Sequence, residues 1–227
     1  MRLSRFVILC IMTTMFLVVS PSAVDASELS TVMSATKFLQ QVRSNIVTRI
    51  PPTVLRQSRG ILVIPDVIKA GFILAGQRGQ GLLLIKDATD KWTNPSFVTL
   101  TGGSIGFQAG GQSSDVVLLL LTQESINGIT NNKFTLGGDA EVAAGPVGIS
   151  KGAATDFGGA EILSYSRSRG VFLGVSLTGS SIEIDKNANE KYYNRKGISA
   201  NDIFTDYTLI APPEIDNFKM ALLASQL

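Results

Sequence analysis

Glycine is concentrated in one part of this chain: 21 of its 22 glycines lie between Gly60 and Gly179. The residues around them form short runs rich in Val, Ile, Leu and Phe, which are typical of β-strands. Strands with this much glycine bend sharply or pack closely, backbone against backbone. The pattern predicts an α+β fold with a mostly antiparallel, strongly curved or barrel-like sheet. An N-terminal amphipathic helix and short C-terminal helices are expected to pack on that sheet.

Turn-forming residues, such as Pro65-Asp66 and Gly110-Gly111, separate the apolar runs. Strands are expected at 61–64, 71–74, 81–85, 97–100, 104–108, 116–121, 140–144, 161–165, 171–175 and 181–184. Helices are expected at 123–130, 199–204 and 213–224. Because no linker-like segment interrupts the chain, residues 27–227 are expected to form a single domain. It would consist of a helical arm (27–52), a β-rich core (58–205) and a C-terminal helix (206–227).

The first 26 residues have the pattern of a secretory signal peptide. Arg2 and Arg5 precede an apolar run from Phe6 to Val19, and Ala26 provides a small residue before the expected cleavage point. The run is short for a membrane span, which needs about 20 residues. An uncleaved membrane anchor is the alternative. With cleavage, the chain is expected to cross the inner membrane and to lie in the periplasm or on the envelope.

The chain has no histidine, and its single cysteine, Cys10, lies in the segment expected to be removed. Histidine is the usual general base near neutral pH and the commonest metal ligand. We therefore expect no enzymatic activity, no cofactor and no metal site. A Ser–Lys pair using Lys69 or Lys151 stays open as a hydrolase, although no local motif supports it.

Two motifs only partly resemble known ligand-binding loops. Gly76, Gly79 and Gly81 lack the spacing of a dinucleotide fingerprint, and a strand rather than a helix is expected after them. Residues 185–190 begin like a calcium loop, but Glu190 stands where glycine is needed. We interpret the glycines as strand bends and the second segment as a polar hairpin loop.

Basic residues are concentrated near the start of the expected mature chain. Without residues 1–26 the chain has 18 basic and 17 acidic residues, so its overall charge does not indicate nucleic-acid binding. Between Glu28 and Gly60, however, Glu28 is the only acid beside five basic residues: Lys37, Arg43, Arg49, Arg56 and Arg59.

Residues 27–50 show the periodicity of an amphipathic helix, which Pro51-Pro52 is expected to end. Its apolar positions are Leu29, Val32, Met33, Leu39, Val42, Ile46 and Ile50. Such a helix can lie in a membrane interface with its basic face toward anionic lipid. It can equally dock its apolar face on the β core and leave a solvated charged face. Periodicity alone leaves both alternatives open.

Four segments carry a family resemblance: SRGILVIPDVIKAGF (58–72), GGSIGFQAGGQSSDVVLLL (102–120), GGDAEVAAGPVG (137–148) and EILSYSRSRGVFLGVSLTG (161–179). Trp92 and Pro95 add a W-x-x-P element. In this order the motifs closely resemble the SYLF-domain family of lipid-binding proteins, and the leader resembles its secreted bacterial branch. Thr178 departs from the family pattern, which usually has an acid there, so the role of that acid cannot be transferred.

The resemblance implies non-catalytic, peripheral binding of anionic phospholipid headgroups, here at a bacterial envelope. The basic residues expected to contact lipid are Lys37, Arg43, Arg49, Arg56, Arg59, Lys69, Arg167 and Arg169. Three of these residues also have a possible structural role. Lys69 could cap a strand end, and Arg167 and Arg169 of SYSRSRG could pair with Asp156 or Glu161. The alternative function is a structural or adaptor protein that binds a protein or polymer partner of the envelope through its sheet surface.

Overall fold

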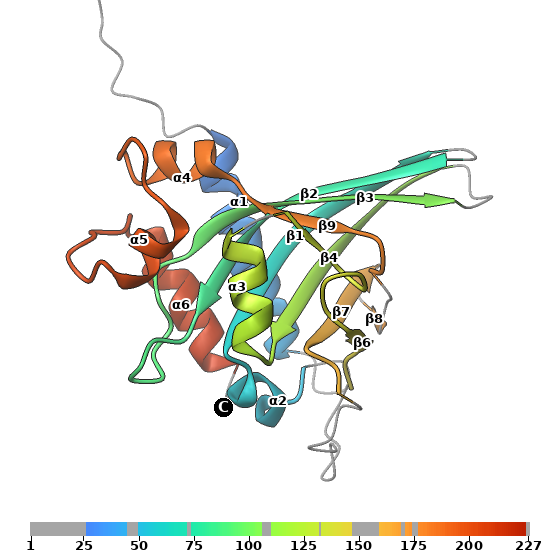
Figure 1. Cartoon of the computed structure of the whole chain (residues 1–227), viewed down its shortest axis with the longest axis horizontal. Helices are drawn as coiled ribbons and strands as arrows, with labels where there is room; N and C mark the ends of the chain where they lie inside the picture. The colour runs from blue at the N-terminus through green and yellow to red at the C-terminus, as the bar shows by residue number, and fades with distance from the viewer. Residues whose placement is uncertain are drawn as a thin grey trace, which may run out of the picture.

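The computed structural model describes residues 26–44, 50–71, 74–105, 110–131, 133–146, 159–168, 171–173 and 177–225. The expected signal peptide lies outside these residues, apart from Ala26. The described chain is an α+β fold with a strongly curved, half-barrel sheet, an N-terminal helix and C-terminal helices (Figure 1). The fold class expected from the glycine pattern is confirmed.

In the described part of the chain the sheet has nine strands in the order β5-β9-β3-β2-β1-β4-β7-β6, with β8 paired to β7. The strands are β1 (Gly60–Gly71), β2 (Leu74–Ile85), β3 (Ser96–Ile105), β4 (Gly110–Leu120), β5 (Phe134–Thr135), β6 (Val142–Ala144), β7 (Ile162–Ser168), β8 (Val171–Leu173) and β9 (Ser181–Ile184). All pairs are antiparallel except β6 with β7.

Helices cover both faces of the sheet. They are α1 (Ala26–Ser44), α2 (Pro52–Gln57), α3 (Gln123–Asn131), α4 (Lys186–Tyr192), α5 (Ala200–Thr205) and α6 (Glu214–Ala224). Figure 1 shows α3 in front of the sheet and α1 with α6 behind it. Helix α3 contacts both β9 and β4, although three strands separate them in the sheet. The sheet therefore curls around α3, as a half-barrel does.

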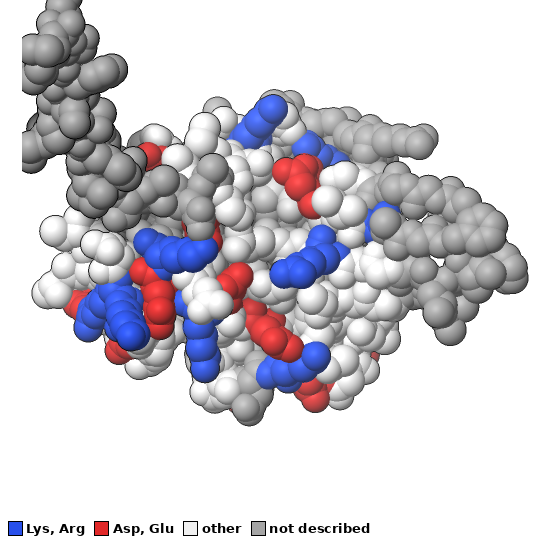
Figure 2. All heavy atoms as spheres, turned by 90° about the horizontal axis from the view of Figure 1, so that it is seen from above, with Lys and Arg blue, Asp and Glu red and all other residues white. Residues whose placement is uncertain are grey.

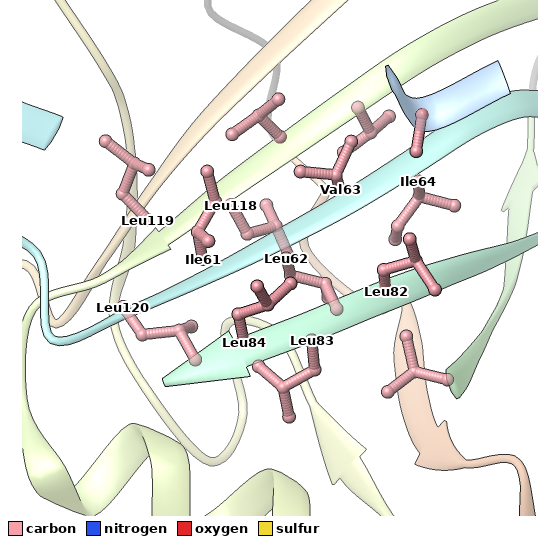
Figure 3. Packing of buried hydrophobic residues seen from close by; sticks show 14 of the residues in the cluster. Ile61, Leu62, Val63, Ile64, Leu82, Leu83, Leu84, Leu118, Leu119 and Leu120 are labelled. Atoms are coloured by element: carbon pink, nitrogen blue, oxygen red, sulfur yellow. The ribbon is translucent and has the colours of Figure 1, made fainter. Parts of the chain in front are cut away.

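The core is formed by one end of the central strands, where the start of β1 pairs with the ends of β2 and β4. Residues 61–64 of β1, 82–84 of β2 and 116–120 of β4 are consecutive and buried, so both faces of these strands are covered (Figure 3). Continuous apolar runs are what strands buried on both faces require. The glycines allow close approach: a Cβ at Gly79 would lie 2.8 Å from Ile64 Cγ2 and 2.9 Å from Val67 Cγ2.

The turn predicted at Pro65-Asp66 is wrong, because β1 continues through it. The pairing register of β1 shifts there against both neighbouring strands, and Asp66 has a φ of 52°. Asp tolerates this left-handed conformation better than most residues, and the Asp66 N–H donates to Asp115 Oδ1 at 3.2 Å. A bulge inside a long strand thus produces the same local sequence signal as a chain reversal.

Several strand boundaries also differ from the prediction. The runs at 97–100 and 104–108 belong, as far as they are described, to the single strand β3. Residues 71–74 are not a separate strand: Gly71 ends β1 and Leu74 begins β2. Residues 72–73 and 106–109 lie outside the described part of the chain. The glycines inside these long strands were therefore wrongly interpreted as turns between short strands.

Two helices were missed. Pro51-Pro52 does mark a break after α1, but Pro52 also begins α2, since proline suits the first helical turn. The polar hairpin loop expected at 185–190 is wrong: these residues start α4, and the Asp185 carboxylate accepts the Ala188 N–H at 3.0 Å as its N-cap.

Candidate functional site

The apolar face of α1 is docked on the protein core. Its buried residues are Val32, Ala35, Phe38, Leu39 and Val42, all at most 4% exposed. The helix packs on β1, β2 and α6, and the Thr31 hydroxyl donates to Gln80 Oε1 of β2 at 2.7 Å. Of the two alternatives left open by periodicity, the structure has the docked helix, so these apolar residues face the sheet and α6 and are not free to enter a bilayer.

Docking leaves several of the expected lipid-binding cations on the surface. Lys37 is exposed on α1, Arg59 directly before β1 and Lys69 near the far end of β1. Within the described residues, none of these three side chains makes an ion pair. Such cations keep their full attraction for an anionic partner because no neighbouring carboxylate neutralises them.

For the other expected lipid-binding arginines the structure describes only part of the surroundings. Arg56 is exposed on α2, and its carbonyl accepts the Lys86 ammonium at 2.7 Å. Arg43 belongs to the last turn of α1, while its side chain lies outside the described part, as do Arg49 and Arg169.

The expected site residues do not form one patch. Arg59 and Lys69 stand at opposite ends of β1, ten residues apart, a separation of about 33 Å in an extended strand. On the face seen from above, basic and acidic side chains lie next to one another over much of the described surface (Figure 2). The sequence identified exposed cations but not their grouping.

Arg167 has structural partners, which differ from the acids considered in the sequence. On the sheet it pairs with Asp115 of β4 at 3.0 Å, and both side chains are only 17% exposed. On α1 it donates to the Gln41 side chain and lies over the Phe38 ring, 5.0 Å from the ring centre. Arg167 therefore connects β7, β4 and α1.

Arg78 is an exposed cation that was not among the expected lipid-binding residues. Arg78 lies on β2, is exposed, and makes no ion pair with any described residue. It stands between Gly76 and Gly79, so the segment was interpreted as a set of glycine bends. A basic residue inside a glycine-rich strand, without an acid nearby in sequence, was the available signal.

The described residues offer little acid–base chemistry. Lys69 has no hydrogen bond to a serine among them, and Lys151 lies outside them, so the Ser–Lys alternative gains no support. Burial raises the pKa of Tyr165 and of Tyr192 well above the usual value, which keeps both phenols neutral. No group of three or more His, Cys, Asp or Glu within the described ranges is arranged to hold a metal ion.

A hollow of about 520 Å³ lies beside α3 and β5. It is lined by Thr122, Glu124, Gly128, Lys133, Phe134, Asp139 and Glu161. Its carboxylates and its lysine have opposite charges, and Lys133 pairs with Glu183 at 3.2 Å. We assign no ligand to it. Among the helices that the structure describes, none has the length and apolarity needed to span a bilayer.

A curved α+β half-barrel with unpaired surface cations is the class of domain that these observations define. Residues 101–225 match a family model described as "Ysc84: Las17-binding protein actin regulator". The chain therefore belongs to the Ysc84 family, the SYLF-domain family that its motifs resemble.

Three similar proteins illustrate the relationship. LAS seventeen-binding protein 3 of Saccharomyces cerevisiae is 36% identical over 148 residues, 63% of this chain and 32% of the relative. SH3 domain-containing YSC84-like protein 1 is 35% identical over 156 residues in Xenopus laevis (68% of this chain, 46% of the relative). The Bos taurus protein of that name is 33% identical over 167 residues (73% and 49%).

The chain thus matches about a third to a half of the length of these relatives. All three are eukaryotic, so they establish the family but do not test the expected membership in its secreted bacterial branch. The name of the yeast relative and the description of the family both refer to binding of Las17.

Proposed function

We propose that this protein binds anionic phospholipid headgroups peripherally, at a bacterial envelope and without catalysing a reaction. The observation that carries the proposal is that three of the expected lipid-binding residues, Lys37, Arg59 and Lys69, are exposed and make no ion pair with a described residue. Each basic residue near an anionic membrane contributes about 1 kcal/mol of attraction. Because the apolar face of α1 is buried, contact would be mainly electrostatic and not by insertion of that helix.

Vesicle sedimentation tests the proposal. Protein purified after expression of the full chain is mixed with vesicles of phosphatidylcholine alone or of equimolar phosphatidylcholine and phosphatidylglycerol. We expect binding to the anionic vesicles only, and a strong loss of binding as salt screens the charges. Equal binding to both kinds of vesicle, or no binding to either, would refute the proposal.

The location is part of the proposal and rests on the signal-peptide pattern. Export with cleavage after Ala26 would produce a protein that starts at Ser27, next to the first residue of α1. Mass spectrometry of protein recovered from the periplasm of an expressing bacterium measures this directly. Recovery of the uncleaved chain from the membrane fraction would favour the anchor alternative.

A protein partner is the second candidate, favoured by the family description and by exposed apolar residues. Tyr207 and Ile210, between α5 and α6, are 81% and 91% exposed. Side chains of this kind are common at protein interfaces. Such a partner would be a protein whose binding to this chain persists at high salt and is lost in the Ile210→Asp variant. Binding of that variant to vesicles should be unchanged.

A further inference from the structure

The outer parts of four neighbouring strands carry a row of exposed side chains. Ile68 of β1 stands opposite Arg78 of β2 and Ser113 of β4, and Arg78 stands opposite Thr101 of β3. All four residues are exposed, and Ile68 is 60% exposed. Directly opposed residues in antiparallel strands point to the same face of a sheet. The row therefore forms one continuous surface across β3, β2, β1 and β4.

This surface is on the face of the sheet that also carries α1. Gln80, which binds Thr31 of α1, lies two residues from Arg78 on β2. Asp115, which pairs with Arg167 under α1, lies two residues from Ser113 on β4. Residues two apart in a strand share a face. The exposed row thus runs beside α1, about 7 Å farther out along the strands.

Beyond the row, the same face is open at two glycines, Gly76 and Gly103. Gly76 and Gly103 are paired with each other, and a Cβ built on either would meet no heavy atom within 4 Å. On the opposite face, a Cβ at Gly102 would come within 2.7 Å of Gln77 Nε2 and 2.9 Å of Ser180 Oγ. The strands here project past the helices (Figure 1), so a flat partner has access to this side.

The charge of this region has one sign. Residues 67–78 and 101–114 contain Lys69 and Arg78 but no Asp or Glu. Gln41 is the residue of α1 that contacts Arg167. Lys37 is four residues from Gln41, and residues four apart lie on the same face of a helix. Lys37 therefore borders the region from α1. Lys37 and Arg78 make no ion pair with a described residue. An exposed isoleucine between unpaired cations matches an anionic phospholipid surface, which offers phosphates above an apolar interior.

We propose that this shelf is the membrane-contact surface of the protein, with Arg78 and Lys37 binding lipid phosphates and Ile68 contacting the interface between them. The shelf is defined by Thr101, Arg78, Ile68 and Ser113 and is bordered by α1. This inference rests on the proposed lipid-binding function and adds to it the place of contact. Gly76 and Gly103, the next pair outward on β2 and β3, have no side chain, so a bilayer can approach the row closely there.

A fluorescent label locates the contact. Ile68→Cys and, as a matched control, Lys196→Cys are labelled with an environment-sensitive fluorophore in a Cys10→Ser background, which leaves no other cysteine. Lys196 is exposed in the segment between α4 and α5. With equimolar phosphatidylcholine and phosphatidylglycerol vesicles, the label at position 68 should increase in emission and shift to the blue. The label at position 196 should not change.

Charge reversal gives an independent measurement. Arg78→Glu should weaken vesicle partitioning about 10-fold, and Lys37→Glu by a similar factor, whereas Lys196→Glu should stay close to the parent protein. If the parent binds anionic vesicles while the label at 68 stays silent and Arg78→Glu binds as Lys196→Glu does, the shelf is not the contact surface. The proposed function would survive that result. If the parent itself does not bind, both proposals fail.

Discussion

Arg167 and Asp115 form a 3.0 Å ion pair that joins β7 to β4 beneath α1. The same guanidinium lies over the Phe38 ring of α1, and Asp115 also accepts the backbone N–H of the Asp66 bulge. One charged pair therefore links the N-terminal helix, two strands and the irregularity in β1. The basic motif SYSRSRG supplies its arginine.

We predict that Arg167→Ala destabilises the protein by about 1–3 kcal/mol, because it leaves the mostly buried carboxylate of Asp115 without its charged partner. Urea unfolding measures the loss. Hydrogen–deuterium exchange should increase in α1 more than in β2. Unchanged stability together with weaker vesicle binding would instead make Arg167 a lipid-contacting residue, as its sequence motif indicated.

Gly145→Ala should destabilise the fold, because a Cβ at this position would overlap the ring of buried Tyr165. Overpacking of this kind costs about 1–3 kcal/mol. Gly103→Ala is the matched control, since its Cβ would enter open space; it should be neutral or stabilise by up to about 1 kcal/mol. Equal melting temperatures for the two variants would contradict the prediction.

Asn189 anchors α4 to β3 from a fully buried position. Its Oδ1 accepts the Phe97 N–H at 2.7 Å, and its Nδ2 donates to Ser96 Oγ at 2.9 Å. Asn189→Ala leaves both groups unsatisfied and should cost about 2–4 kcal/mol in urea unfolding. Asn187→Ala, at an exposed position of the same helix, is the control and should change stability little. Similar losses in both variants would mean that helix propensity, not the anchor, matters.

Asp202 closes a capping box with Ser199 at the start of α5. Hydrogen bonds from the Ser199 backbone and hydroxyl hold the pKa of the Asp202 carboxyl below its usual range. Since the folded pKa is lowered, the stabilisation is complete above the unfolded pKa and is lost as pH falls through the folded one. Asp202→Asn should therefore be less stable than the parent at neutral pH and converge with it in strong acid. A constant difference at all pH values would show that the charge is not responsible.

Local pattern predicted much of the fold. The helix expected at 27–50 is present as α1 but is described only as far as Ser44, and Ile50 is not helical. The expected elements at 123–130, 181–184 and 213–224 match α3, β9 and α6 to within a residue at either end. In each of these segments the spacing of apolar side chains matches a single period, either that of a helix or that of a strand. Pro65-Asp66 and the capped start of α4 were misinterpreted, because a bulge and an N-cap use the same residues as a turn.

The sequence by itself determined the family, the curved glycine-rich sheet and the concentration of basic residues between Glu28 and Gly60, because these depend on residue type and on short-range spacing. Only the tertiary structure decided that α1 is docked, that Arg167 is paired with Asp115, and that Arg59 and Lys69 are far apart while Ile68 and Arg78 are neighbours. Strand pairing sets those relationships, since it joins residues distant in sequence. The order of residues along the chain does not give the pairing register of the strands, and that register decides which side chains lie together on one face of the sheet.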